Sequence, residues 1–401
     1  MKHVAIVGGS LAGISTARAL RAQGYDGSLI LVGAEPHRPY DRPPLSKEFL
    51  GAGSAGSVVE EPELSLEMPG EDLGITWRLG VAATAFDSSD RTLTLADGDR
   101  LKPDGVVLAT GAAPMPLPGM PFLRGVHLLR TIDEARALRD DLARGGRLVV
   151  VGGGFIGSEV ASTARQLGLD VTVVEAAPLP LVAQVGPQMA EVLSGLHAAG
   201  GTRLECGVGV NGLVGSDAVE GVELADGRVL PADVVVVGIG ARPVTAWLEG
   251  SGIELAQGHR GVICDVAGAT NRAGVVAVGD CSAWYDEDFG GPHRVEHWTS
   301  AHERGPLAAA TLLGLEPPRL RGGRAPYFWS DQYGLRIQFA GTYQAGDAVT
   351  IEEGSVDERS LLAVYRRGGQ PVAVLGLDRP RPFTQLRRSL GAAPKAPAAA
   401  G

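Results

Sequence analysis

The amino-acid sequence predicts an α/β fold with two Rossmann-like βαβ units and a C-terminal α+β domain. One observation is that an apolar strand, a glycine-rich turn and an amphipathic helix follow one another near the N-terminus. Another is that the same order recurs at Leu148–Glu175. A third is that short strand-like runs replace this pattern after about Arg321.

The stretch Leu148–Glu175 has the order strand, turn, helix and strand. Leu148–Val151 has the apolar composition of a buried strand, and Phe155–Leu167 has helical apolar spacing. A second apolar run, Val171–Val174, leads directly into an acidic residue. This order is that of a βαβ unit.

The turn of this unit carries G-x-G-x-x-G at Gly152, Gly154 and Gly157. In order, these glycines allow a tight turn, close approach of backbone to a pyrophosphate, and close packing of helix on strand. The helix N-terminus offers free N–H groups and the positive end of its dipole to phosphates. Glu175 follows Gly152 by 23 positions, near the spacing of an acid that binds a ribose. The stretch is therefore predicted to bind a dinucleotide.

The N-terminus repeats the pattern with one departure. A strand at Val4–Val7 precedes the turn Gly8–Gly13, a helix at Ile14–Ala22 and a strand at Leu29–Val32. The middle glycine of the fingerprint is replaced by Ser10, which leaves the turn possible but slightly crowds a pyrophosphate.

Two dinucleotide cradles in one chain indicate electron transfer between two bound nucleotides. Glu35 lies 27 positions after Gly8, within reach of a ribose if the connection is slightly longer. The duplication is much more specific than either motif taken singly.

The rest of the chain is predicted to hold strands, one further helix before the second unit, and a C-terminal helix. These elements are β-hairpins over 75–110, a buried strand at Val106–Ala109, a proline-rich linker at Ala113–Pro121, a helix at Arg130–Leu142, a hairpin at Gly221–Leu230, buried strands at Val234–Val237 and Val275–Val278, strands at Arg336–Ala340, Ala348–Glu352, Leu361–Tyr365 and Val372–Leu375, and a helix at Phe383–Leu390.

Composition narrows the class of protein. The chain has 401 residues, 44% hydrophobic and 20% charged, which predicts two or three globular domains. It contains no apolar run long enough to span a membrane, and its first strand leaves no room for a signal peptide. The three cysteines are far apart, so we expect a reducing cytoplasm and no dithiol chemistry. A net charge of −10 argues against nucleic-acid binding.

A possible metal motif occurs at His293–His297, which matches the H-x-x-E-H pattern of a zinc peptidase family. That chemistry needs both histidines on one helical face. Gly290-Gly291-Pro292 directly precedes the motif, so we expect no metal.

The chain resembles the pyridine-nucleotide-dependent flavoprotein reductases of the glutathione-reductase structural class. The resemblance rests on GGSLAG near the start, LATGAAP at 108–114, GGGFIGSE at 152–159, VVVVGIGARP at 234–243 and VAVGD at 276–280. More narrowly, it resembles the ferredoxin reductases of bacterial Rieske oxygenase and cytochrome P450 systems, through RPYDRPPLSKEFL, RVEHWTSAHERG and PYFWSDQYGLRIQFAG.

This resemblance implies an order of domains and an activity. It implies an FAD domain split over 1–112 and 245–320, an NADH domain at 113–244 and an α+β domain at 321–390, and we expect a disordered tail at 391–401. Electrons would pass from NADH through non-covalent FAD, one at a time, to a [2Fe–2S] ferredoxin that feeds an oxygenase or P450. No cysteine pair or single cysteine stands where related enzymes place one, so electrons would leave directly from the flavin.

The resemblance also implies which residues contact each cofactor. For FAD they are Gly8, Ser10, Leu11, Ala12, Gly13, Glu35, Arg42, Lys47, Val81, Ala109, Thr110, Gly111, Arg130, Asp280, His297 and Trp298. For NADH they are Gly152, Gly154, Phe155, Ile156, Gly157, Glu159, Glu175 and Gly240.

Three of these residues carry further hypotheses. The resemblance implies that Lys47 and Glu159 form an ion pair beside flavin N5; the alternative for Glu159 is an acid favoured at a helix N-terminus. Glu175 should select NADH, since its carboxylate accepts ribose hydroxyls and repels a 2′-phosphate, and two alanines follow it. Trp329 would cover the flavin on the acceptor side; the alternative is a core aromatic.

The charge of the C-terminal region suggests where a ferredoxin would dock. Ferredoxins are usually acidic, so we expect a basic docking face on the C-terminal side. The alternative is that its arginines are scattered over the surface and form no docking face. These arginines are Arg319, Arg321, Arg324, Arg336, Arg366, Arg367, Arg387 and Arg388. Alternative functions are an NADH-dependent reductase of a quinone or dehydroascorbate and a redox-sensing flavoprotein. We expect a monomer or a weak homodimer.

Overall fold

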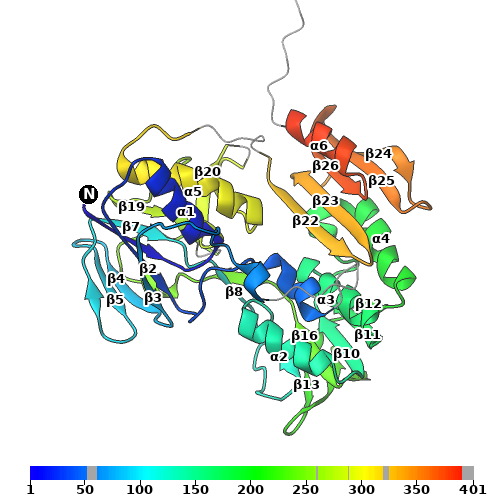
Figure 1. Ribbon diagram of the computed structural model, residues 1–401. Coiled ribbons are helices and arrows are strands. Elements are labelled where there is room, and N and C mark those ends of the chain that lie inside the picture. The colour runs from blue at the N-terminus through cyan, green and yellow to red at the C-terminus, as the bar shows by residue number, and fades with distance from the viewer. Residues whose placement is uncertain (52–60, 259–260, 288, 319–324, 391–401) are drawn as a thin grey trace, which may run out of the picture. The chain divides into compact units, whose positions relative to one another are not determined.

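The computed structural model describes residues 1–51, 61–258, 261–287, 289–318 and 325–390 (Figure 1). The chain divides into two compact units. Unit 1 comprises Met1–Asp41, Glu61–Ala113 and Ala241–Arg321, and unit 2 comprises Arg42–Glu60, Pro114–Gly240 and Gly322–Gly401. The predicted tail at 391–401 lies outside the described residues.

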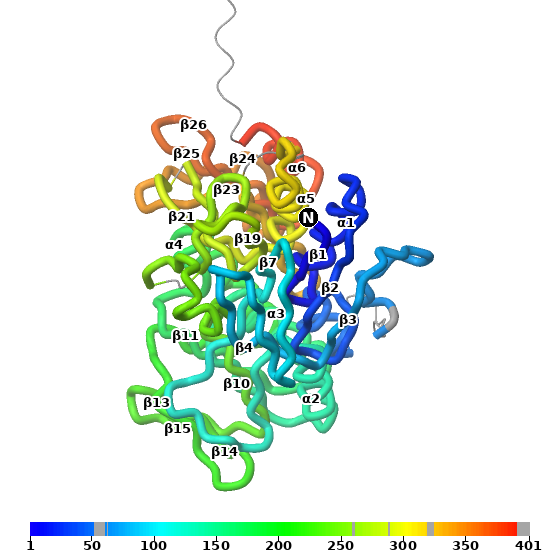
Figure 2. Tube along the Cα trace, turned by 90° about the vertical axis from the view of Figure 1, so that its left-hand side faces the viewer, coloured from blue at the N-terminus to red at the C-terminus, as the bar shows by residue number. Residues whose placement is uncertain are grey.

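Unit 1 is built on a parallel sheet in the order β19-β7-β1-β2-β3. Its strands are β1 (His3–Val7), β2 (Ser28–Gly33), β3 (Ile75–Leu79), β7 (Gly105–Leu108) and β19 (Val275–Ala277). The central strands β1 and β7 are buried along nearly their whole length, as expected of a sheet covered on both faces. Figure 2 shows β1, β2 and β3 side by side.

Two helices of unit 1 pack against each other, α1 (Leu11–Ala22) and α5 (Trp298–Leu313). Gly305 permits this close approach, because a Cβ there would lie 3.1 Å from Ser15. Figure 1 shows both helices together although they come from opposite ends of the unit's sequence.

One strand prediction for unit 1 was wrong. The segment 75–110 was expected to form β-hairpins, but β3 joins the parallel sheet beside β2. Only the later strands form antiparallel pairs, since β5 (Thr92–Leu95) pairs with β4 (Ala83–Asp87) and β6 (Arg100–Leu101). A three-stranded sheet of β18 (Val262–Cys264), β20 (Ser282–Asp286) and β21 (Gly291–Arg294) and the two short strands β8 (Ala112–Pro114) and β17 (Ala241–Pro243) were not foreseen.

Unit 2 contains the second parallel sheet, in the order β12-β11-β10-β16-β9. Its elements are β9 (Val126–His127), α2 (Ile132–Leu142), β10 (Arg147–Val151), α3 (Phe155–Gln166), β11 (Asp170–Glu175), α4 (Val182–Ala199), β12 (Arg203–Cys206) and β16 (Val234–Val237). A small antiparallel sheet follows, with β13 (Val210–Gly215), β14 (Val219–Leu224) and β15 (Val229–Pro231). Helix α2 begins with a capping box between Thr131 and Glu134.

The C-terminal part of unit 2 is an antiparallel sheet in the order β22-β23-β26-β25-β24. Its elements are β22 (Tyr327–Gln332), β23 (Leu335–Gly341), β24 (Ala348–Ser355), β25 (Ser360–Arg367), β26 (Gln370–Leu377) and the helix α6 (Pro380–Ser389). The predicted strands are all present, and β22 is an additional one. With the two parallel sheets, this arrangement confirms the predicted fold class.

Helix α4 and the C-terminal sheet share one apolar core. Val185, Met189 and Leu193 of α4 lie in the same buried cluster as Phe339 and Tyr365 of the sheet. The Tyr365 hydroxyl donates a 2.7 Å hydrogen bond to the backbone oxygen of Val185, which satisfies its polar atom inside this core.

A short loop of unit 2 contributes a buried side chain to the core. It consists of two 3₁₀ turns, η1 (Pro43–Ser46) and η2 (Glu48–Leu50). The side chain of Phe49 is fully buried, and the guanidinium of Arg139 on α2 lies 4.7 Å from the centre of its ring. The loop is therefore held against the parallel half of unit 2.

Across the described ranges, no helix combines the length and the apolar composition that a membrane crossing requires.

Replacing His197 by glutamine is expected to flatten the dependence of stability on pH. Burial lowers the pKa of His197 from 6.5 to about 4, so the folded chain keeps the ring neutral where the unfolded chain protonates it. Stability is therefore lost as pH falls from 6.5 toward 4, by about 2 kcal/mol at pH 5. Thermal unfolding measured at pH 7 and pH 5 checks this.

The matched control for this experiment is His3→Gln, because the side chain of His3 is exposed. Its unfolding temperature should fall between pH 7 and pH 5 as much as that of the parent chain. An equally large fall in His197→Gln would contradict the expected role of His197.

Candidate functional site

The residues expected around FAD in unit 1 follow the carboxyl ends of neighbouring parallel strands. Gly8 follows β1, Glu35 follows β2, Ala109–Gly111 follow β7 and Asp280 follows β19. Parallel strands place these ends at one edge of the sheet, where α/β folds bind nucleotides. Val81 lies on the same side after β3, and its N–H donates to Gly33 O.

The first fingerprint is shaped as a backbone cradle. At Gly8, where φ is +128°, a Cβ would lie 2.0 Å from Ala109 O, and at Gly13 it would lie 2.1 Å from Gly8 O. Ser10, the departure from the fingerprint, is the N-cap of α1, and Leu11 and Ala12 form its first turn. The backbone N–H groups at this helix N-terminus would suit a pyrophosphate.

Two side chains next to the cradle are held in place. The Tyr40 hydroxyl donates a hydrogen bond to the Glu35 carboxylate, which keeps that acid beside the sheet edge. The Thr110 hydroxyl donates a 2.6 Å bond to Val244 O, and Val244 N–H donates to Gly111 O.

Trp298 is the first residue of α5, and His297 directly before it is the N-cap. The indole N–H of Trp298 donates a 2.7 Å hydrogen bond to the Asp41 carboxylate. Burial lowers the pKa of His297 to about 4, so its ring is neutral at neutral pH. His293 lies on strand β21 and His297 outside any helix, so the H-x-x-E-H run lacks the helical face that zinc would need.

The second fingerprint repeats the cradle in unit 2. At Gly152, where φ is +103°, a Cβ would lie 2.4 Å from Gly238 O, and at Gly157 it would lie 2.1 Å from Gly152 O. Around Gly154, the N-cap of α3, a Cβ would meet nothing closer than 4.0 Å. That opening is where a pyrophosphate would approach. Ile156 in the first turn is 46% exposed, which leaves its side chain accessible.

Glu175 ends strand β11 and is fixed by two backbone donors. The N–H of Gly153 donates to Oε2 and the N–H of Ala177 donates to Oε1, both at 2.8 Å. These bonds tie the acid to the glycine turn, so the carboxylate is oriented before any ligand binds. Gly240, beyond β16, completes this edge and has φ +122°.

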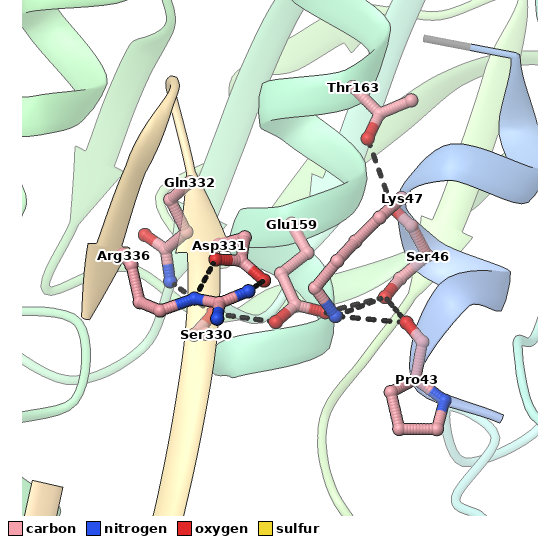
Figure 3. Close-up of polar contacts among 9 residues, drawn as sticks. All are labelled: Pro43, Ser46, Lys47, Glu159, Thr163, Ser330, Asp331, Gln332 and Arg336. Atoms are coloured by element: carbon pink, nitrogen blue, oxygen red, sulfur yellow. Dashed lines mark hydrogen bonds and ion pairs between the residues drawn. The ribbon is translucent and has the colours of Figure 1, made fainter. Parts of the chain in front are cut away.

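Unit 2 contains a buried ion pair. Lys47 Nζ lies 2.7 Å from Glu159 Oε2, and the side chains are 11% and 3% exposed (Figure 3). The predicted pairing of these two residues is therefore present. Lys47 comes from the loop and Glu159 from the first turns of α3.

The pair sits within further polar contacts. Lys47 Nζ also donates to Pro43 O at 2.9 Å, and the Ser46 hydroxyl donates to Glu159 Oε2. Thr163 on α3 donates to Ser46 O at 3.0 Å. The loop is thus bound to α3 through Ser46 as well as through Lys47.

The other residues of unit 2 expected at the flavin also come together. The guanidinium of Arg42 donates to the backbone oxygen of Arg130, just before α2. Arg42, Lys47 and Arg130 therefore lie in one unit, and the remaining expected FAD residues lie in the other.

Trp329 lies on β22 and is half-buried. Its ring stacks on that of Tyr327, with centroids 6.0 Å apart. The guanidinium of Arg387 lies 4.0 Å from the centre of the Tyr327 ring.

The arginines expected to dock a ferredoxin differ in their surroundings. Arg319, Arg321 and Arg324 lie outside the described residues. Arg336, Arg366 and Arg367 pair with Asp331, Glu352 and Asp347 at 2.8, 2.6 and 2.8 Å. Arg388, on the last turn of α6, is exposed. Much of the expected positive charge is therefore locally neutralised.

The three cysteine thiols are harder to ionise than a free cysteine. Burial raises the pKa of Cys264 and Cys281, which are 3% and 0% exposed. Burial and the charge of Glu175 raise the pKa of Cys206. In the described part of the chain, no group of three or more His, Cys, Asp or Glu side chains could hold a metal ion.

Two nucleotide cradles at sheet edges and a buried lysine–glutamate pair define an oxidoreductase that works with two nucleotides. Residues 2–305 match the model of the pyridine nucleotide-disulphide oxidoreductase family, and residues 327–400 match that of the reductase C-terminal domain. The chain belongs to the ferredoxin reductases of this family.

The relatives found by sequence and by structure agree. The chain is 39% identical over 388 residues to the ferredoxin reductase component of chlorobenzene dioxygenase from Cupriavidus sp. (strain PS12), covering 96% of this chain and 92% of the relative. It is 37% identical, with the same coverage, to the ferredoxin–NAD(+) reductase subunit of the benzene 1,2-dioxygenase system of Pseudomonas putida. The putidaredoxin reductase in its covalent complex with putidaredoxin has a TM-score of 0.89 at 32% identity, covering 97% of this chain and 92% of that one. The predicted resemblance is confirmed.

Sequence reasoning missed several residues of the site. Ser46, Ser330 and Gln332 contact the ion pair or one another, yet no spacing in the sequence links them. Ser330 is 171 positions from the residue that it contacts. The only available signal was proximity to Lys47 and Trp329, which were already candidates.

Proposed function

We propose that the chain passes electrons from NADH through FAD, one at a time, to a [2Fe–2S] ferredoxin that feeds an oxygenase or cytochrome P450. The observation that carries this proposal is the buried Lys47–Glu159 pair beside a dinucleotide cradle, in a chain that aligns with ferredoxin reductases over nearly its full length. When bound, FAD supplies the two-electron to one-electron step that separates hydride donor from iron–sulfur acceptor.

The chain's own residues have binding and orienting roles. In unit 1, Gly8 and Gly13 would hold the FAD pyrophosphate, with Glu35 and Asp280 on its ribose and ribityl hydroxyls. In unit 2, the turn from Gly152 would hold NADH. Hydride transfer needs orientation of the two rings and no general acid or base.

Lys47 and Glu159 tune this transfer. With FAD bound, the ammonium of Lys47 would stabilise negative charge on the reduced flavin, and Glu159 holds that ammonium in place. Water is largely excluded from the pair, so its charges act in a low dielectric.

The ferredoxin is proposed to dock through its acidic face on the C-terminal-side arginines, with Trp329 near the electron exit. Trp329 and the exposed Arg388 both belong to the C-terminal sheet and helix. The chain is proposed to act as a monomer or weak homodimer, which sedimentation analysis tests.

The function is tested by comparing acceptors for the NADH-reduced protein. We expect rapid reduction of a [2Fe–2S] ferredoxin and slow reduction of quinones and dehydroascorbate. If docking depends on charges such as the exposed Arg388, raising ionic strength from about 0.01 to 0.15 M shortens the Debye length from about 30 to 8 Å and should slow ferredoxin reduction steeply. Ferricyanide reduction serves as the control and should change little.

Other outcomes would support other functions. Faster turnover with a quinone or dehydroascorbate than with any ferredoxin would contradict the proposal. Slow turnover with every acceptor and a long-lived flavin–NAD charge-transfer complex would indicate a redox-sensing flavoprotein.

A further inference from the structure

Strand β22 turns alternate residues toward α3. The Phe328 ring lies 4.3 Å from the ring of Phe155, and the Ser330 hydroxyl donates a 2.6 Å hydrogen bond to Glu159 Oε1. Gln332, two positions further, donates from Nε2 to Ser330 Oγ at 3.0 Å. This period of two is that of a β-strand, so one face of β22 bears on the first turns of α3.

The carboxylate of Glu159 is held through both of its oxygens. Lys47 and Ser46 donate to Oε2, whereas Ser330 donates to Oε1 from the opposite side (Figure 3). A carboxylate bound through one oxygen can still turn about its last bond. With a donor on each oxygen, that rotation would break a charge-assisted hydrogen bond.

Gln332 sets the direction of the Ser330 hydrogen bond. A serine hydroxyl has one proton to donate and lone pairs to accept. Because the Gln332 amide donates to Ser330 Oγ, the serine proton remains available for Glu159. Ser330 and Gln332 are 0% and 1% exposed, so water does not compete for these groups.

We propose that Ser330 is a positioning residue for hydride transfer, which keeps the Glu159 carboxylate oriented toward Lys47. This inference rests on the proposed function, because it assigns Ser330 a role through the ion pair. Ser330 acts from the C-terminal sheet, so that sheet completes the site for NADH as well as carrying the proposed exit for electrons.

Ser330→Ala is expected to slow FAD reduction by saturating NADH about 10-fold, since one hydrogen bond to a charged group is lost. The affinity of the oxidised holoenzyme for NAD⁺ should stay within about two-fold, because orientation and not binding is affected. Ser330→Thr keeps the hydroxyl and should restore most of the rate. Stopped-flow reduction and NAD⁺ titration measure these quantities.

A double-mutant cycle tests whether Ser330 acts through Glu159. In a Glu159→Gln background, Ser330→Ala should change the rate by less than about two-fold. Infrared difference spectra give a second readout, because the Glu159 carboxylate band should move in Ser330→Ala. The control is Ser194→Ala, which removes a 2.7 Å bond from a hydroxyl to a backbone oxygen in α4 and should change neither rate nor band.

The outcomes separate this inference from the proposed function. A parental rate and an unmoved band in Ser330→Ala, with Glu159→Gln slow, would overturn the role of Ser330 only. A full 10-fold loss in the Glu159→Gln background would show that Ser330 acts by another route and would overturn it too. Failure to reduce any ferredoxin, with NADH still reducing FAD at a rate sensitive to Ser330, would overturn the proposed acceptor and leave this inference standing.

Discussion

Replacing Lys47 by methionine is expected to slow FAD reduction by NADH about 100-fold, because it removes the preorganised charge that is proposed to act at the flavin. It is also expected to destabilise the protein by about 3–5 kcal/mol, because the Glu159 carboxylate is left buried without its cation. Stopped-flow kinetics and thermal unfolding measure the two effects separately.

The double variant Lys47→Met/Glu159→Gln separates the effect of Lys47 on stability from its effect on the rate of hydride transfer. Removing both charges relieves the unpaired carboxylate, so much of the lost stability should return while hydride transfer stays slow. Lys102→Met is the exposed control, since Lys102 lies 2.7 Å from Asp90 with its side chain 65% exposed. Its cost should stay below about 1 kcal/mol. An unchanged rate and flavin potential in Lys47→Met would refute the tuning role.

Replacing Glu175 by glutamine is expected to lower kcat/KM for NADH about 10-fold and to raise the NADPH-to-NADH ratio by about 10- to 100-fold. The first effect follows from weakening charge-assisted hydrogen bonds to the ribose hydroxyls. The second follows because the negative charge that repels a 2′-phosphate is removed. Steady-state kinetics with both nucleotides measures the ratio.

Glutamine preserves the shape of Glu175, and its one amide oxygen can keep one of the two hydrogen bonds that the carboxylate accepts from the N–H groups of Gly153 and Ala177. The matched control is Glu205→Gln on the neighbouring strand β12, where the carboxylate pairs with Arg228. It should leave the ratio within about two-fold, since Glu205 is not placed on the ribose. A parent protein that uses NADPH as well as NADH would contradict the assignment of Glu175.

The sequence predicted the parts of the fold whose determinants are local. Leu148–Val151 and Val4–Val7 read as buried strands because parallel strands covered on both faces are continuously apolar. The fingerprint glycines could be predicted from the sequence because only glycine fits where two backbone segments come this close. Gly152 and Gly238 are an example.

Long-range features were harder to predict. Ile75–Leu79 was expected in a hairpin, but as β3 it pairs with β2 in the parallel sheet. The periodicity of a strand's sequence does not indicate which other strand it pairs with. Helix α4 was not predicted. Its sequence contains Pro187, a residue that is disfavoured in helix interiors, and its backbone departs from helical geometry at Gly186.

The candidate site shows the same division. Lys47 and Glu159 were paired by resemblance, and their contact is present. Ser330 was not selected, because a serine in a strand has an ordinary composition and its significance comes only from the carboxylate that folding brings within 2.6 Å. The roles assigned to the individual cofactor residues, and the domain boundaries, stay predictions.

The apolar cluster shared by α4 and the C-terminal sheet has a consequence for building chimaeras from such reductases. Exchanging residues 325–390 for the matching segment of a relative, to change the choice of ferredoxin, would set a foreign surface against Met189 and Leu193. Such a graft should tolerate the exchange only if α4 travels with the sheet, because packed cores accept mismatched volumes poorly. Helix α4 and the C-terminal sheet should therefore be exchanged together, as one packed piece.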